Sequence, residues 1–291
     1  MRNMGDPHTP DKSTPSTVAG SPPPTELLAL AVRVAGAGAA LARKIRDEAI
    51  TDVQTKSTDT DVVTAADHAV ERFVIDAIAV ERPGDAVLSE ESGVVGEAGR
   101  TAVRWILDPI DGTVNYLYGL PQYAVSLAAE VAGVVVAGVV LNAATGDQWV
   151  AVRGGGAYRG GYPDGRPLSG SRATDLGQSL IATGFAYDPA VRVHQARVLA
   201  GIADRIRDIR RYGAAALDLC AAAEGVVDGF YERGLNLWDR AAGGLVATEA
   251  GLMVTGIDGG PPDEKLVVAA PPAIHGALIA LLQEAGAAGV P

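Results

Sequence analysis

The chain has 291 residues, with 35 aspartate and glutamate residues against 24 lysine and arginine residues, so its formal charge is −11 at pH 7. Such an acidic surface repels a phosphate backbone, which argues against nucleic-acid binding through a broad basic face. Hydrophobic residues make up 48% and charged residues 20%, a composition typical of a globular protein rather than a disordered one. Small phosphorylated ligands are not excluded, because metal ions and backbone N–H groups can hold them.

The cysteine and proline patterns bear on location. Cys220 is the single cysteine, so no internal disulfide can form, and we expect a reducing, cytoplasmic location. Residues 1–24 hold six of the 17 prolines and almost no large apolar side chain, which predicts a disordered extension without the apolar core of a secretory signal. We expect no membrane span, because residues 27–41 are interrupted by Arg33 and residues 131–141 are too few.

The predicted elements divide the chain into two halves. Helices are expected over 25–50 and 65–82. Short strands are expected at 86–88 and 103–107, and antiparallel strands joined by glycine turns at 124–130, 133–142 and 148–152. Strands are then expected at 179–185, 209–212, 225–231 and 266–270, alternating with helices at 191–203, 214–223, 238–250 and 272–285. The pattern predicts an N-terminal α+β half with an antiparallel sheet (25–170) and a C-terminal α/β half (171–291), stacked as layers of helix and sheet.

One segment combines several chemical signals, the string Asp-Pro-Ile-Asp-Gly-Thr over residues 108–113. An apolar strand delivers Asp108 and Asp111, three residues apart. Pro109 is expected to end the strand, and Gly112 to let the backbone approach a ligand. Gly112 and Thr113 then open a short helix, whose free N–H groups suit a phosphate. An ordinary acidic β-turn would show the same spacing, so the string alone does not decide the chemistry.

Further acids stand at the ends of predicted elements. Glu90 follows a strand, Asp239 begins a helix, and Asp67 lies on a helix. Carboxylate oxygens are the ligands that Mg²⁺ prefers, and two such ions can activate a water and stabilise the leaving oxygen of a phosphoryl transfer. Taken singly, each acid has a simpler interpretation: a solvated helix start for Glu90, a cap or first-turn acid for Asp239, and a surface charge for Asp67.

Together, these motifs resemble the inositol monophosphatase family, in its bacterial SuhB-type branch. The similarity covers about residues 25–287. It rests on Lys56 with Asp61–Asp67, Ser89–Ser92, Trp105–Tyr116, Trp238–Gly244 and Thr248–Gly251. The resemblance implies an α+β fold, the layered α/β/α/β/α sandwich of the inositol monophosphatases and sugar phosphatases. It also implies Mg²⁺-dependent hydrolysis of myo-inositol 1-phosphate and related polyol phosphates.

The resemblance further implies a role for each matching residue. The metal ligands would be Glu90, Asp108, the carbonyl oxygen of Ile110, Asp111 and Asp239, holding two to three Mg²⁺, and Li⁺ would inhibit. The catalytic residues would be Thr113, Glu90 and Asp67. The substrate-binding residues would be Gly112, Thr113, Asp111, Gly213, Ala214, Ala215, Glu232 and Asp239.

Substrate choice stays open at this level. Glu232 suits the vicinal hydroxyls of a polyol, although a salt bridge to Arg233 or Arg240 would explain it equally well. Ala214 stands where relatives commonly carry Thr or Ser, so one hydroxyl contact is missing. Histidinol-phosphate phosphatase, fructose-1,6-bisphosphatase and 3′-phosphoadenosine 5′-phosphate phosphatase are alternatives on the same fold, and a partner of the transcription machinery is an alternative of another class. The resemblance implies a homodimer, and we expect neither direct nucleic-acid nor membrane binding.

Overall fold

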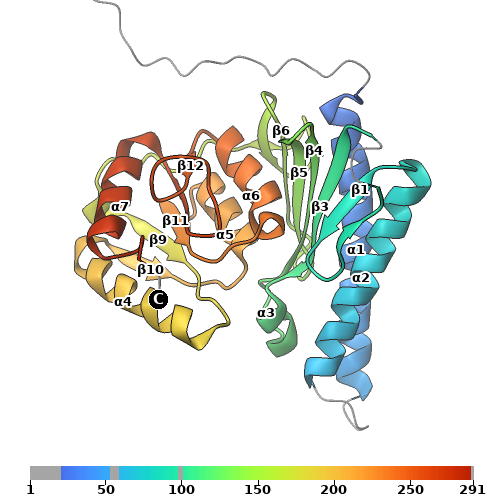
Figure 1. Ribbon diagram of the computed structural model, residues 1–291, viewed down its shortest axis with the longest axis horizontal. Helices are drawn as coiled ribbons and strands as arrows, with labels where there is room; N and C mark the ends of the chain where they lie inside the picture. The colour runs from blue at the N-terminus through green and yellow to red at the C-terminus, as the bar shows by residue number, and fades with distance from the viewer. Residues whose placement is uncertain (1–20, 53–58, 98–100, 290–291) are drawn as a thin grey trace, which may run out of the picture.

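The computed structural model describes residues 21–52, 59–97 and 101–289. Within them, helices and sheets stack in the order helices, sheet, helices, sheet, helices (Figure 1). The layered α+β sandwich implied by the resemblance is therefore confirmed. The predicted disorder of residues 1–20 and the motif residue Lys56 lie outside the described residues.

The first layer consists of α1 (Pro24–Asp52) and α2 (Asp59–Glu81). By length and composition, Pro24–Glu48 could cross a membrane, although the sequence analysis expected no span. Half of its most apolar window is buried in the structure, where small side chains such as Ala31, Ala35 and Ala39 belong to the core beneath β4 and β5. Contacts inside the fold thus account for the apolar face of α1.

The second layer is an eight-stranded sheet in the order β2-β1-β3-β4-β5-β6-β7-β8. Its strands are β1 (Ala86–Ser89), β2 (Gly93–Val95), β3 (Val103–Asp111), β4 (Ala124–Val131), β5 (Val134–Asn142), β6 (Gln148–Val152), β7 (Gly156–Arg159) and β8 (Arg166–Pro167). From β3 to β8 all neighbours are antiparallel, as predicted for 124–152. β1 pairs with β3 in parallel, with Ser89 opposite Leu107, so the next residues, Glu90 and Asp108, come side by side.

The predicted end of β3 at residue 107 is wrong, because the strand continues through Pro109 to Asp111. Asp108 pairs with Ser126 and Asp111 with Ala124, so β3 has one residue more than β4 between these pairs. This irregularity is a β-bulge, which tolerates a proline because the extra residue leaves the ladder. The bulge brings two acids that are three residues apart to one cavity.

The third layer lies between the sheets and consists of α5 (Ala215–Glu224) and α6 (Leu237–Glu249), while α3 (Thr113–Tyr118) follows β3 at the edge of the site (Figure 1). Cys220 is fully buried in α5. The predicted strand at 225–231 begins only at Gly229, because Gly225 adopts a left-handed conformation that ends α5 and a turn follows.

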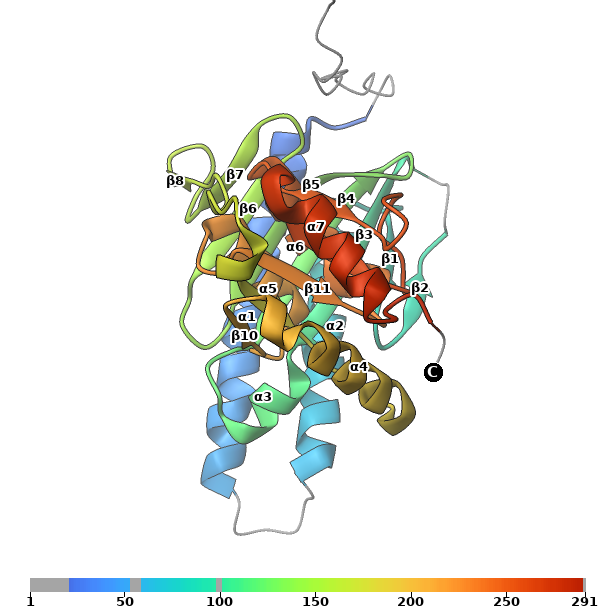
Figure 2. The ribbon, with the colours of Figure 1, turned by 90° about the vertical axis from the view of Figure 1, so that its left-hand side faces the viewer.

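The last two layers are a five-stranded sheet and the helices that cover its outer face. The sheet order is β10-β9-β11-β13-β12. The strands are β9 (Leu180–Thr183), β10 (Asp208–Arg210), β11 (Gly229–Glu232), β12 (Met253–Thr255) and β13 (Val267–Ala270). Helices α4 (Pro189–Ile202) and α7 (Pro272–Glu284) lie over it, as Figure 2 shows. The two sheets use separate stretches of chain, but α5 contacts strands of both, so the division at residue 170 into two halves stays a prediction.

Candidate active site

A cavity of about 190 Å³ opens where α3, the ends of β1, β3 and β11, and the first turns of α5 and α6 meet. It gathers all but two of the residues that the resemblance assigns to the site, namely Glu90, Asp108, Ile110, Asp111, Gly112, Thr113, Gly213, Ala215, Glu232 and Asp239. Asp67 and Ala214 do not line it. Both are buried, and the Ala214 methyl group packs below Gly112. Sequence positions from 90 to 239 are thus brought to one place, while their individual roles stay predictions.

Asp108 and Asp111 differ in their hydrogen bonds. Asp108 is 1% exposed, and its Oδ1 has no partner among the described residues. Asp111 accepts two backbone hydrogen bonds, from the N–H of Ala215 to Oδ1 at 3.1 Å and from the N–H of Ala216 to Oδ2 at 2.8 Å. Asp111 therefore satisfies the N-terminus of α5 and joins the two halves of the site.

The simpler interpretation of Asp239 as a capping acid is also confirmed, because its side chain caps the N-terminus of α6. Its Oδ2 accepts the N–H of Asn236 at 2.6 Å, and its carboxylate lines the cavity as well. Asp67, by contrast, is not a surface charge, since it is 3% exposed and its Oδ1 has no partner in the described part of the chain. Asp67 lies on α2 close enough to Glu91, Glu90 and Glu71 for their charges to raise its pKa, and Glu90, which follows β1, lines the cavity.

The carboxylates have raised pKa values. Burial raises the pKa of Asp67 to about 8, of Glu90 and Asp111 to about 7 and of Asp239 to about 6, and that of Asp108 well above its ordinary value. At Asp67, Glu90, Asp108 and Asp111, repulsion from neighbouring carboxylates contributes to this rise. A group of acids this close together is unfavourable without a positive charge among them.

These features fit a divalent cation. Among the described residues, no three His, Cys, Asp or Glu side chains stand close enough together to hold one metal ion without rearranging. However, one oxygen each of Asp67 and Asp108 is a hard donor without a hydrogen-bond partner among the described residues, and the mutual repulsion of the acids is what a cation would remove. The donor set therefore fits Mg²⁺ chemistry.

At the start of α3, the N–H groups of Gly112 and Thr113 have no backbone partner within the described residues. Gly112 has φ +87°, and Thr113 Oγ1 donates a hydrogen bond to the carbonyl oxygen of Ile110 at 3.1 Å. A Cβ on Gly112 would lie 2.6 Å from the Gln122 carbonyl oxygen, so the backbone passes where a side chain would clash. The expected short helix after Gly112 is present, with its first N–H groups at the cavity edge.

Asn115 links the segment after α3 to the turn at Tyr212 and Gly213, a contact that was not expected from the sequence. Its Nδ2 lies 2.8 Å from the carbonyl oxygens of Gln122 and Tyr212 and 3.3 Å from that of Gly213. The side chain is 3% exposed. Its place inside the 108–116 motif was the only sequence signal for this contact.

Glu232 ends β11 and faces the cavity. Its pKa is raised to about 8, mainly by burial and also by the charges of Asp111 and Asp239, while Arg211 acts in the opposite direction. Within the described residues, its carboxylate has no ion pair with Arg233 or Arg240, so the salt-bridge alternative is not what the structure contains. Glu232 is thus free to face a ligand.

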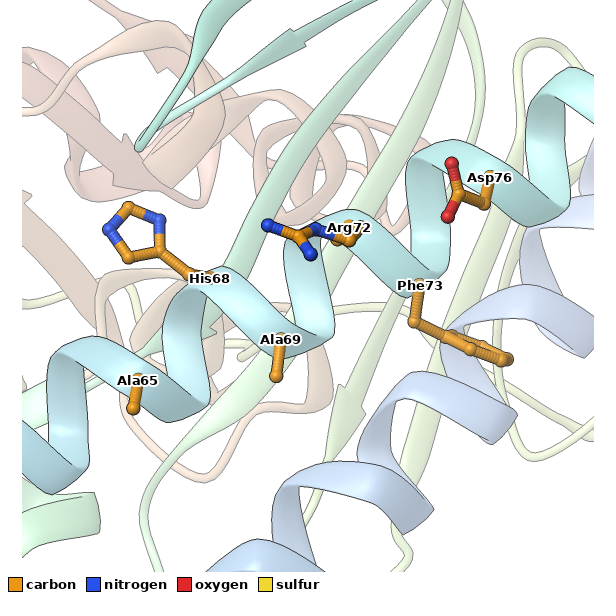
Figure 3. Close-up of a pocket in the computed structure, with 6 residues that line it drawn as sticks. All are labelled: Ala65, His68, Ala69, Arg72, Phe73 and Asp76. Atoms are coloured by element: carbon orange, nitrogen blue, oxygen red, sulfur yellow. The ribbon is translucent and has the colours of Figure 1, made fainter.

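Other residues line the cavity without having been predicted. They are Val114, Phe185, Ala186, Tyr187, Arg211, Arg233, Gly234, Leu235 and Asn236. Most lie within a few residues of Gly213 or Glu232, which was a usable signal, whereas the segment 185–187 carried none. A separate hollow lies on α2, and the described residues that line it all come from that one helix (Figure 3). It lacks the convergence of several elements seen at the acidic cavity.

Comparison with known proteins agrees with the fold and with the family that the sequence resembles. The model of the inositol monophosphatase family matches residues 24–287. The chain is 46% identical over 239 residues to an inositol-1-monophosphatase of Mycobacterium leprae, covering 79% of this chain and 81% of that one. It is 37% identical over 236 residues to the Nus factor SuhB of Escherichia coli K12, covering 80% and 86%. The structure of Mycobacterium tuberculosis SuhB matches with a TM-score of 0.79 and 39% identity, over 92% of this chain and 100% of that one.

The fold and the acidic cavity are thus those of a phosphatase from a metal-dependent group. The chain belongs to the inositol monophosphatase family. A phosphorylated substrate follows from this membership.

Proposed function

We propose that the protein is a Mg²⁺-dependent phosphomonoesterase that hydrolyses myo-inositol 1-phosphate and related polyol phosphates. The observation that carries the proposal is the single cavity that is lined by Asp108, Asp111 and Asp239, by Gly112 and Thr113 at the start of α3, and by Glu232. The acids supply a cation site, the N–H groups a phosphate site, and Glu232 an acceptor for hydroxyl groups.

The phosphate and the water would be placed by residues of β1 and α3. The N–H groups of Gly112 and Thr113 would donate to phosphate oxygens. Because the Thr113 hydroxyl donates to Ile110, its lone pairs can accept a hydrogen bond from the attacking water. Glu90 would take that water's proton together with Thr113, and Asp67, whose carboxylate is close enough to Glu90 for their charges to interact, would assist. Mg²⁺, when bound, supplies a lowered water pKa and stabilises charge on the phosphoryl group.

The polyol and its leaving oxygen would be placed by the other half. Asp239, close to Glu90, would help protonate the leaving oxygen through a second water. Glu232 and the turn at Gly213 would hold the ring hydroxyls. The N–H of Ala215 is already donated to Asp111, so it contributes to the polyol site through that carboxylate rather than directly.

A pH-dependent stability tests the cation site without measuring activity. The site carboxylates have folded-state pKa values of about 6 to 8 against ordinary values near 4, so the folded protein binds more protons than the unfolded chain between these limits. The free energy of unfolding of metal-free protein should therefore fall as the pH rises through this window. Thermal unfolding should show Mg²⁺ raising Tm more at about pH 8 than at about pH 5.5. An equal Mg²⁺ effect at both pH values would contradict the assignment of these carboxylates to the cation.

Removing the metal and adding it back tests directly whether phosphate release requires Mg²⁺. Protein treated with EDTA should release no phosphate from myo-inositol 1-phosphate, and added Mg²⁺ should restore the rate. Li⁺ at millimolar concentration should inhibit, which is a proposal taken from the family resemblance. Full activity in EDTA would remove the cation from the mechanism, and insensitivity to Li⁺ would remove that family property only.

We propose further that the protein is a cytoplasmic homodimer. The support is the family resemblance for the dimer and the single buried cysteine for the location. Size-exclusion chromatography with light scattering should give twice the 29.7 kDa chain mass. A monomer at micromolar concentration would contradict the first part.

A further inference from the structure

The carboxylate of Glu232 lies against Gly184, which has no side chain. Gly184 begins the segment 184–187, which lies between β9 and α4 and lines the cavity with Phe185, Ala186 and Tyr187. A Cβ built on Gly184 would lie 2.0 Å from Glu232 Oε1 and 2.1 Å from both Cδ and Oε2. The backbone of Gly184 has no positive φ, so alanine is allowed by conformation and excluded only by the carboxylate.

One buried side chain holds this segment in place. Gln195 lies on α4, is 8% exposed, and does not line the cavity. Its Oε1 accepts the N–H of Ala186 at 2.8 Å. Its Nε2 donates to the carbonyl oxygens of Gly184 at 3.5 Å and Arg233 at 3.3 Å.

These contacts fix both sides of Glu232 at once. Gly184 is the surface against which the carboxylate packs, and Arg233 is the next residue along the chain from Glu232. A glutamine suits the position because it offers one acceptor and two donors to one N–H and two carbonyl oxygens. Glutamate at 195 would face two carbonyl oxygens without a donor, and leucine would leave all three backbone groups unpaired.

We propose that Gly184 and Gln195 are positioning residues that set the place of the Glu232 carboxylate and thereby the selectivity for polyol phosphates. The proposal rests on the proposed function, in which Glu232 binds ring hydroxyls. Neither residue is one of the proposed metal ligands, and neither lines the cavity. The acids and N–H groups that act on the phosphate come from β1, β3, α3 and α6. A change at 184 or 195 should therefore affect the polyol and spare the phosphate chemistry.

The experiment compares two substrates. Myo-inositol 1-phosphate carries ring hydroxyls, and p-nitrophenyl phosphate carries none. For Gly184→Ala and Gln195→Leu, kcat/KM for the inositol substrate should fall about tenfold, mainly through KM, and that for p-nitrophenyl phosphate should stay within about twofold. Arg197→Ala, an exposed change on the same helix, should alter neither substrate.

The double variant with Glu232→Ala tests whether the effect of Gly184→Ala on kcat/KM depends on the Glu232 carboxylate. Glu232→Ala removes the carboxylate that clashes with a Cβ at 184, so adding Gly184→Ala to it should cost nothing more. A further loss in the double variant, or an equal loss on both substrates, would overturn the proposal in favour of a general structural role. Gln195→Glu gives an independent arm, with the same selective loss expected, should Gly184→Ala fail to fold.

The single variant Glu232→Ala distinguishes a failure of the positioning role from a failure of the proposed function. If it loses the inositol substrate while Gly184→Ala and Gln195→Leu do not, the positioning role is wrong and the proposed function stands. If it leaves KM for myo-inositol 1-phosphate unchanged, Glu232 does not bind the polyol, and both the positioning role and this part of the proposed function are overturned.

Discussion

Asp108→Asn is expected to lower kcat/KM for phosphate release by about 10³-fold, equivalent to about 4 kcal/mol of transition-state stabilisation. Asp108 is fully buried at the bulge of β3, and its Oδ1 has no hydrogen-bond partner within the described residues. The amide keeps the size and removes the negative charge that a cation requires. Since the same change relieves repulsion from Asp111 and Glu90, the metal-free variant should unfold at a higher temperature than the parent.

Asp218→Asn provides the matched control for Asp108→Asn. Asp218 is also fully buried, with its carboxylate close to the backbone N–H of Gly213, and it does not line the cavity. Its replacement should likewise raise the Tm and should leave kcat/KM within about threefold. Full activity of Asp108→Asn, or a lower Tm together with lost activity, would show that Asp108 is not a cation ligand.

Gly112→Ala should have the second-largest effect, on both stability and activity. Its left-handed backbone costs an alanine about 1–2 kcal/mol, and the new methyl group would lie 2.6 Å from the Gln122 carbonyl oxygen. With the cost of overpacking, we expect a loss of about 3 kcal/mol in the free energy of unfolding. The shifted backbone moves the N–H groups that would hold the phosphate, which should lower kcat by about 10²-fold.

Gly146→Ala isolates the backbone part of that loss. Gly146 has φ +79°, and a Cβ there would meet nothing within 4 Å. Chemical denaturation should give a loss of about 1 kcal/mol for Gly146→Ala, with activity unchanged. Equal losses in the two variants would mean that the close packing of Gly112 against Gln122 has no energetic weight.

The sequence predicted the acidic site better than it predicted how the backbone builds it. Asp108, Asp111 and Thr113 are close in sequence, so one short string was enough to find them. Pro109 was expected to end the strand, because proline cannot donate to a sheet ladder. The bulge that accommodates it depends on the register with β4, which the local string does not contain.

Contacts between distant segments were the least predictable. Asp67 has the periodicity of an ordinary helix residue, and only the packing of α2 shows that it is buried. Gln195 and Gly184 carry no local motif, since Gln195 binds backbone groups of Gly184, Ala186 and Arg233, and Gly184 lies against the side chain of Glu232. In α1, apolar composition alone gave no way to distinguish a helix that packs on a sheet from one that could cross a membrane.

The most direct test of the proposed function is a comparison of kcat/KM values for phosphate release in Mg²⁺. The substrates are myo-inositol 1-phosphate, histidinol phosphate, fructose 1,6-bisphosphate and 3′-phosphoadenosine 5′-phosphate. Because Glu232 lines the cavity and is proposed to accept hydrogen bonds from ring hydroxyls, myo-inositol 1-phosphate should have the highest value, and Glu232→Ala should reduce that preference. A higher value for histidinol phosphate, or no hydrolysis of any of the four, would contradict the assignment of this cavity to polyol phosphates.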